Sequence, residues 1–295
     1  MTVGDSGLKK AGIIAGFLAP SLIPLTLFTV GPMVGTLGIS FLDWNLLTSP
    51  EWIGLDNYRR LFTSGEFWAA VGHTFGYLGM YLPLVFAGGL AIALALNQGV
   101  RALPFFRSLY FLPVVTSWVV VALVWKWLLN PQGGIVNTAL GWVGLAGPGW
   151  WTDPTWAMPA VVLASSWKDL GFVMVIFLAG LQAIPTDYYE AARVDGAGWW
   201  RRFRHVTLPL LTPSSFFVLV ISLINGFQVF DQVYVMTGGG PANATTVMVE
   251  RIYTHAFEYN EMGYAAAMSW ALFLIVMLFT ALQFRLEKRW VHYAQ

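Results

Sequence analysis

Six long stretches of the chain are almost wholly apolar, and shorter polar segments separate them. A helix needs about 20 mostly apolar residues to cross the hydrocarbon core of a membrane, and each stretch is long enough. The pattern predicts six spanning helices: Ile13–Leu42, Val71–Leu96, Ser108–Leu129, Met158–Ile184, Ser214–Met236 and Gly263–Phe284. The first is too long for the apolar region of a cleaved signal peptide. Its three prolines, Pro20, Pro24 and Pro32, are tolerable where neighbouring groups satisfy the freed backbone.

The composition favours the same class of protein. Hydrophobic residues make up 57% of the 295 residues and charged residues only 11%. A soluble domain carries about 25% charged residues, so a soluble enzyme is nearly excluded. The chain has no cysteine, which excludes disulfides and thiolate chemistry. We therefore predict an all-α integral membrane protein.

The distribution of charge orients the predicted spans. One side of the membrane receives 11 of the 16 basic residues: Lys9, Lys10, Arg101, Arg107, Arg193, Arg201, Arg202, Arg204, Arg285, Lys288 and Arg289. The positive-inside rule assigns this side to the cytoplasm, and six spans then place both termini there. The external side carries Arg59, Arg60 and Arg251 together with Asp43, Glu51, Asp56, Glu66, Asp153, Glu250, Glu258 and Glu261. We expect short interfacial helices or turns in its loops Asp43–Trp68 and Asn130–Trp156.

The cytoplasmic loop between the fourth and fifth spans, Ile184–Pro213, has the most informative sequence. Thr186 or Asp187 can begin a short helix that runs to Val194. Gly196 and Gly198 then permit a bend, and a basic second segment follows along the membrane surface. From physics alone, arginines that merely contact lipid headgroups explain this loop about as well as a docking site does.

The residues of this loop resemble a known motif. The strings Glu190-Ala191-Ala192 and Asp195-Gly196-Ala197, followed by Phe203 and Leu208-Pro209, are similar to the EAA motif of ABC-importer permeases. The resemblance implies a coupling helix that docks on a cytoplasmic ATPase subunit. Its small alanines would allow close approach, its acid would pair with a basic group, and its glycine would allow the turn. The implied coupling residues are Glu190, Ala191, Ala192, Asp195, Gly196 and Ala197.

Two further segments resemble the carbohydrate branch of that family. They are Ile53–Tyr58, continuing to Leu61-Phe62 and Phe67-Trp68, and Phe230–Tyr234, continuing to Thr237–Pro241. The resemblance is to the first permease of the maltose and glycerol-3-phosphate importers, and it implies the type I, MetI-like fold. Maltose-type first permeases carry further N-terminal spans and a large external domain, so the exact substrate is not carried over. The expected organisation is a cytoplasmic segment 1–12, a transmembrane permease domain 13–284 with the coupling loop 185–213, and a cytoplasmic tail 285–295.

The resemblance also implies a function and a set of partners. The chain is expected to be a non-catalytic permease subunit of an ATP-driven sugar importer in the cell membrane of a prokaryote, forming half of the translocation path. Its partners would be a second permease subunit, two cytoplasmic ATPase subunits, an extracytoplasmic substrate-binding protein and membrane lipid, but no nucleic acid. ATP and Mg would reside on the ATPase, because GDSGLKK and GGGPANATT lack the order of a phosphate-binding loop. We interpret the triglycine as a flexible external turn, and we predict neither a catalytic nor a metal site.

Polar residues inside the fourth and fifth spans are candidates for the substrate path. They are Lys168 in the fourth span and Ser222, Asn225 and Gln228 in the fifth. Asp231 and Gln232 continue the broad polar face of the fifth span. Polar groups can bond sugar hydroxyls, and nearby rings can stack on the apolar face of a sugar. Contacts between helices, with Lys168 paired to a carboxylate, are the alternative interpretation.

The mostly neutral character of these residues favours a neutral sugar. A glycerol-3-phosphate or glycerophosphodiester importer is the alternative, but its substrate would want several cationic donors, and Lys168 is the one clear candidate in these two spans. An ion-coupled secondary transporter is a more distant alternative, because it has no use for a coupling loop.

Overall fold

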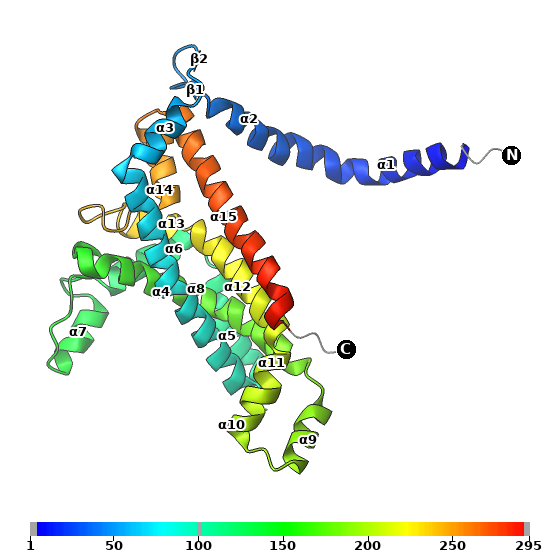
Figure 1. Ribbon diagram of the computed structural model, residues 1–295. Coiled ribbons are helices and arrows are strands. Elements are labelled where there is room, and N and C mark those ends of the chain that lie inside the picture. Colours follow the sequence, from blue (N-terminus) through cyan, green and yellow to red (C-terminus); the bar gives the residue numbers. More distant parts are fainter. Residues whose placement is uncertain (1–4, 99–101, 292–295) are drawn as a thin grey trace. The chain divides into compact units, whose positions relative to one another are not determined.

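The computed structural model describes residues 5–98 and 102–291 (Figure 1). Four of its helices are long and apolar enough to cross a membrane. Two bent pairs, Leu103–Val115 with Trp118–Leu128 and Trp199–Leu210 with Thr212–Phe227, raise the number to six if each pair is one span. The predicted all-α membrane architecture is therefore confirmed. The outermost parts of the predicted terminal segments, 1–4 and 292–295, and Arg101 lie outside the described residues. The chain forms two compact units, Met1–Ser64 with Ile252–Ala271, and Gly65–Arg251 with Leu272–Gln295.

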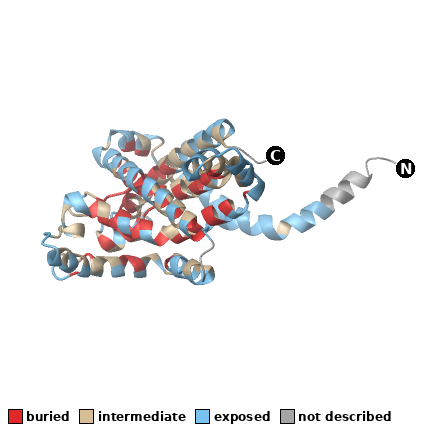
Figure 2. Ribbon diagram, turned by 90° about the horizontal axis from the view of Figure 1, so that it is seen from below, coloured by how far each residue is buried: buried red, intermediate tan, exposed pale blue. Residues whose placement is uncertain are grey.

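The first unit contains the N-terminal span and several short elements. Its elements are α1 (Asp5–Leu25), the π-helical turn η1 (Thr26–Val30), α2 (Gly31–Ile39), β1 (Leu42–Asp43), β2 (Glu51–Trp52), α3 (Asp56–Thr63), the π-helical turn η4 (Thr254–Glu258) and the first part of α15 (Met262–Trp290). The span Ile13–Ile39 continues past Pro20 and Pro24 through η1. No residue in the most apolar 18-residue stretch of this span is buried (Figure 2).

A small cap, on the side predicted to be external, closes this unit. The strands β1 and β2 pair antiparallel, with Leu42 opposite Trp52. The Asn57 side-chain amide donates to the backbone oxygens of Ser40 and Leu42 at 3.0 and 2.9 Å. The buried Asn57 thereby satisfies backbone acceptors where the first span ends, as buried polar groups must be satisfied. The short helices and turns expected in this loop are present.

The second unit contains the other spans. Its elements are α4 (Gly65–Leu96), α5 (Leu103–Val115), α6 (Trp118–Leu128), α7 (Ile135–Trp142), the 3-10 turn η2 (Trp150–Thr152), α8 (Pro154–Gln182), α9 (Thr186–Val194), α10 (Trp199–Arg202), the π-helical turn η3 (Phe203–Thr207), α11 (Leu208–Leu210), α12 (Thr212–Phe227), α13 (Asp231–Met236), α14 (Met248–Tyr253) and the rest of α15. The helices α4 and α8 pack along each other at its centre. Buried residues occupy 61% of the most apolar window of α8, against 28% in α4. The core of this unit is therefore built around α8.

The third predicted span, Ser108–Leu129, is not one straight helix. It consists of α5 and α6, which meet at an angle of 99°. Thr116 and Ser117 between them are extended, with ψ of 143° and 140°. At about 1.5 Å per residue, neither half alone crosses an apolar core about 30 Å thick. The prediction of a single continuous helix was wrong here. The hydropathy of a segment shows how long its apolar run is, but not whether the chain bends within it.

The fifth predicted span, Ser214–Met236, is also interrupted. Helix α12 ends at Phe227 and α13 begins at Asp231. The predicted polar helix face therefore does not continue regularly to Asp231 and Gln232. The triglycine turn that follows has a defined hydrogen-bonded conformation. The hydroxyls of Thr237 and Thr245 are joined at 2.8 Å, and the Thr245 hydroxyl donates to the Gly240 oxygen at 2.7 Å.

Candidate functional site

The loop between α8 and α12 presents a short helix that ends in a glycine turn. Helix α9 ends with the backbone N–H of Gly196 donating to the Arg193 oxygen at 3.0 Å and that of Ala197 donating to the Ala192 oxygen at 2.9 Å. Gly196 has φ of +73°, and this pair of hydrogen bonds with a left-handed residue is the Schellman ending of a helix. Gly198 has an ordinary φ of −68°. The bend expected from both glycines thus depends on Gly196.

The predicted coupling residues lie on the surface of this loop. Glu190, Ala191, Asp195 and Gly196 are exposed, and Ala192 and Ala197 are half-buried. Apolar side chains nearby are exposed as well: Tyr188, Val194, Trp199 and Trp200. In Figure 1, α9 and α10 extend beyond the ends of α4 and α8. An exposed helix with small and apolar side chains at the end of a bundle is suited to contact another protein.

A cavity of about 230 Å³ lies within the second unit, away from this loop in the sequence. Its lining comes from five helices, α4, α6, α8, α12 and α13, and from the break after α12: Tyr77, Tyr81, Trp118, Asp169, Asn225, Gln228, Val229, Phe230, Asp231 and Gln232. Among the described residues that line it there are amides, phenols, aromatic rings and two carboxylates, but no basic side chain. Five consecutive residues, 228–232, line the cavity, which a continuous helix would not allow because its successive side chains point in different directions.

Hydrogen bonds fix the walls of this cavity. The Tyr81 hydroxyl donates to Asp169 Oδ2 at 2.7 Å, joining α4 to α8. The ring of Tyr81 stacks on that of Tyr77, with centroids 5.3 Å apart. Gln232 Nε2 donates to the Ser165 hydroxyl at 3.2 Å. Side chains held in this way present a fixed set of polar groups to a ligand.

Lys168 has a different environment from the one predicted. Its Nζ donates to the backbone oxygens of Pro113 and Val114 at 3.1 and 2.8 Å. It also lies 4.8 Å from the centre of the Trp118 ring. The last carbonyls of a helix lack partners within the helix and carry partial negative charge, so a buried cation is stabilised there. Lys168 therefore holds the α5–α6 bend and does not line the cavity.

The other predicted path residues divide between the cavity and the core. Asn225 and Gln228 line the cavity. Ser222, one turn earlier on α12, is buried and does not line it. Sequence reasoning missed Tyr77, Tyr81 and Trp118, because aromatic residues in an apolar span give no separate signal. Lys168 donates to backbone oxygens and not to the carboxylate expected as an alternative, and the neighbouring Asp169 accepts from Tyr81.

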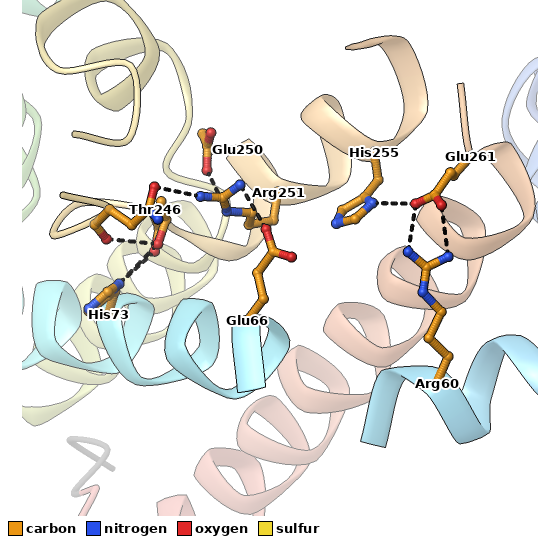
Figure 3. A network of polar contacts seen from close by, with 9 residues as sticks. Arg60, Glu66, His73, Thr246, Glu250, Arg251, His255 and Glu261 are labelled. Carbon is orange, nitrogen blue, oxygen red and sulfur yellow. Dashed lines mark hydrogen bonds and ion pairs between the residues drawn. The ribbon is translucent and has the colours of Figure 1, made fainter. Parts of the chain in front are cut away.

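Two networks of polar contacts involve two of the three arginines of the predicted external side, Arg60 and Arg251 (Figure 3). In the first unit, Arg60 donates through Nη1 and Nη2 to the two oxygens of Glu261, at 2.9 Å each. His255 Nδ1 lies 2.7 Å from one of the same oxygens. Burial raises the pKa of Glu261, but the hydrogen bonds and charges of Arg60 and His255 outweigh it, so the pKa is below its ordinary value.

The second network lies in the second unit. Arg251 Nη1 is 2.8 Å from Glu66 Oε1, and its Nη2 donates to Asn243 Oδ1 at 3.1 Å. Both arginines are thus held in local ion pairs. The orientation stays a prediction from the larger number of basic residues on the other side.

Comparisons with known proteins agree on one kind of protein. Residues 86–292 match the family described as binding-protein-dependent transport system inner membrane component. The chain is 39% identical to the probable ABC transporter permease protein YesP of Bacillus subtilis (strain 168), over 98% of the chain and 97% of that protein. It is 34% identical to the trehalose/maltose transport system permease protein MalF of Thermococcus litoralis, over 93% and 94% of the two chains.

A solved structure resembles the whole chain. It is the bacterial alginate ABC transporter in complex with an alginate pentasaccharide-bound periplasmic protein, with a TM-score of 0.85 and 26% identity. The match covers 98% of this chain and 99% of the other. The similarity thus includes the N-terminal span and both bent helix pairs, and it extends beyond the part matched by the family.

Proposed function

The chain belongs to the family of binding-protein-dependent transport system inner membrane components, and we infer that it is the permease subunit of an ATP-driven importer of sugars. The cavity formed by α4, α6, α8 and the break after α12 carries this inference. Stacked aromatic rings beside amides and carboxylates are the combination that binds a sugar, whose hydroxyls bond polar groups while its C–H face contacts a ring. The names of two similar proteins specify sugars or a sugar polymer as the substrate. One is a trehalose/maltose permease, and the other is an alginate transporter.

A neutral substrate fits the cavity best. Among the described residues that line it, Asp169 and Asp231 are the charged groups, and carboxylates do not attract a phosphate. Lys168, the cation that could have served a phosphorylated substrate, is held by backbone oxygens. These placements disfavour a glycerophosphate or glycerophosphodiester substrate, which wants several cationic donors.

The permease is proposed to work as part of a larger assembly. A second permease subunit would supply the other half of the path, two cytoplasmic ATPase subunits would bind ATP and Mg, and an external binding protein would deliver the sugar. The exposed α9 and its glycine turn support docking of one ATPase through Glu190, Ala191, Ala192, Asp195, Gly196 and Ala197. The chain itself would then not hydrolyse ATP. Its transmembrane permease domain would run from residue 13 to residue 284.

We predict a neutral sugar as the imported substrate. A thermal-shift screen of the cognate binding protein should yield a neutral mono- or oligosaccharide, and vesicles that hold all subunits should take it up. Uptake of a glycerophosphate with no response to any sugar would contradict the neutral-sugar assignment and leave the permease assignment standing.

Matched variants on α12 connect this uptake to the cavity. Asn225→Ala removes a side chain that lines the cavity, whereas Ser222→Ala removes a buried hydroxyl outside it. Loss of one hydrogen bond to the sugar should raise KM by roughly three- to tenfold for Asn225→Ala. Ser222→Ala should stay close to the native KM, and the reverse order would place the path elsewhere.

We predict that both termini of the chain lie in the cytoplasm of a prokaryotic cell. A single cysteine placed at Ser64 or Ala242 should react with an impermeant maleimide added outside intact cells, and one placed at Ser6 or Gln295 should not. The native chain lacks cysteine, so background labelling from it is absent. Labelling of Ser6 and Ser64 positions from the same side would overturn this orientation.

A further inference from the structure

A second cavity, of about 180 Å³, lies between the α9–α10 loop and the ends of the spans. Its polar lining comes from Asn97 and Gln98 after α4, Tyr189 on α9, Arg202 on α10 and Thr207. Phe203 contributes an aromatic wall. The cavity thus joins the segment proposed to dock an ATPase to the ends of the helices that form the sugar cavity.

The depth of this cavity in a membrane follows from the elements around it. Helix α4 ends its apolar run at Leu96, and Asn97 and Gln98 come directly after it. The ring of Phe203 stacks on that of Trp199, with centroids 5.6 Å apart and planes 3° from parallel. Aromatic side chains gather at the boundary between the apolar core and the headgroups. We therefore expect the cavity to lie at the level of the lipid phosphates.

The charge of the lining favours an anion. Among the described residues that line the cavity, Arg202 is the one that carries a formal charge. Its Nε is enclosed and has no hydrogen-bond acceptor in the described protein. A guanidinium group pairs best with planar or tetrahedral oxyanions, to which it can give two parallel hydrogen bonds.

The neutral groups around Arg202 add donors. The hydroxyls of Tyr189 and Thr207 are hydrogen-bonded to each other at 3.1 Å. Since one of them donates in that bond, the other keeps its proton for a further acceptor. The side-chain amides of Asn97 and Gln98 can donate as well. A shielded cation with neighbouring hydroxyl and amide donors is the chemistry that binds a phosphate group.

We propose that this cavity binds a phosphate group and that the headgroup of an anionic phospholipid supplies it. The headgroup would connect Arg202 and Tyr189 to the ends of α4 and α8. Tyr189 precedes Glu190, so the lipid would hold the docking helix against the spans. Coupling would then depend on anionic lipid, which goes beyond the proposed transport function.

The test compares two arginines one position apart. Arg202→Gln removes the charge that lines the cavity, and Arg201→Gln removes an equal charge from an exposed neighbour. The complete transporter is placed in phosphatidylcholine nanodiscs, and native mass spectrometry follows its titration with phosphatidylglycerol. We expect saturable binding that weakens about tenfold in Arg202→Gln and no more than about twofold in Arg201→Gln. Equal weakening would overturn the proposal, because the lipid would then respond only to general surface charge.

Two further arms keep the test decisive. Asn97→Leu keeps every charge and removes an amide of the lining, so it should also weaken phosphatidylglycerol binding. Native affinity in this variant would overturn the assignment to this cavity even if Arg202→Gln proves unstable. Inorganic phosphate is titrated by calorimetry into discs without anionic lipid. Binding of phosphate that requires Arg202, with no binding of phosphatidylglycerol, would support the phosphate site and overturn the lipid as its source.

Discussion

Replacing Gly196 by arginine is expected to abolish sugar uptake while leaving normal amounts of the chain in the membrane. Gly196 ends α9 with φ of +73°, a conformation that side chains with a Cβ rarely adopt. No atom lies within 4 Å of the Cβ that a substitution would add. The variant therefore places a bulky cation on an exposed surface and does not disturb a packed core. The strain alone costs only about 1–2 kcal/mol, so the large effect would come from lost docking.

Three variants separate strain from docking. Gly196→Ala carries the strain without the bulk, and uptake should fall only a few-fold. Gly198→Arg adds the same side chain two residues further on, where φ is −68° and the space around the Cβ is open. Glu190→Arg reverses an exposed charge in the same helix and should match Gly196→Arg. Uptake and ATPase co-purification are measured for each. Normal assembly and transport by Gly196→Arg would contradict the docking assignment of this loop.

The sequence predicted the existence of the spans better than their course. The second, fourth and sixth spans follow the hydropathy pattern, because a run of apolar residues with no interruption has one stable form in a membrane. The third and fifth are broken at Thr116–Ser117 and at Gln228–Phe230, where the direction of the chain depends on tertiary contacts. Lys168, fifty residues away from the first break, supplies part of what makes it stable.

Only some residues of the candidate site could be predicted from the sequence. Asn225 and Gln228 could be identified because a polar residue in an apolar span is conspicuous. Tyr81 and Trp118 could not, since aromatic rings are as common in lipid-facing positions as in cavities. The existence of a turn after α9 followed from its glycines, because a Schellman ending is local to the helix that it closes, but residue type did not distinguish Gly196 from Gly198.

The two cavities of the second unit suggest how the coupling loop could affect the sugar path. Helices α4 and α8 contribute to both cavities, at Tyr81 and Asp169 in one and at Leu94 and Leu181 in the other. A helix is stiff along its axis, so a movement at its loop end is carried to its other contacts. The α5–α6 bend contributes Trp118 to the sugar cavity, and the stability of that bend therefore decides whether the cavity keeps its shape.

Lys168→Met is expected to destabilise the transporter and thereby to remove uptake. Methionine keeps an unbranched apolar chain but donates no hydrogen bond, so the oxygens of Pro113 and Val114 lose their donor. Each buried acceptor left unsatisfied costs ~1–3 kcal/mol, and no water is present in the apolar core to replace the lysine. The loss should appear as a lower unfolding temperature of the purified complex.

Lys126→Met is the matched control for this change. Lys126 Nζ donates to a single backbone oxygen, that of Val235 at 3.2 Å, and lies 5.1 Å from the centre of the Trp151 ring. It is half-buried, so water can replace the lost donor more readily. We therefore expect a clearly smaller fall in unfolding temperature. If Lys168→Met instead keeps the native unfolding temperature and raises KM, Lys168 contacts the sugar and the bend does not depend on it.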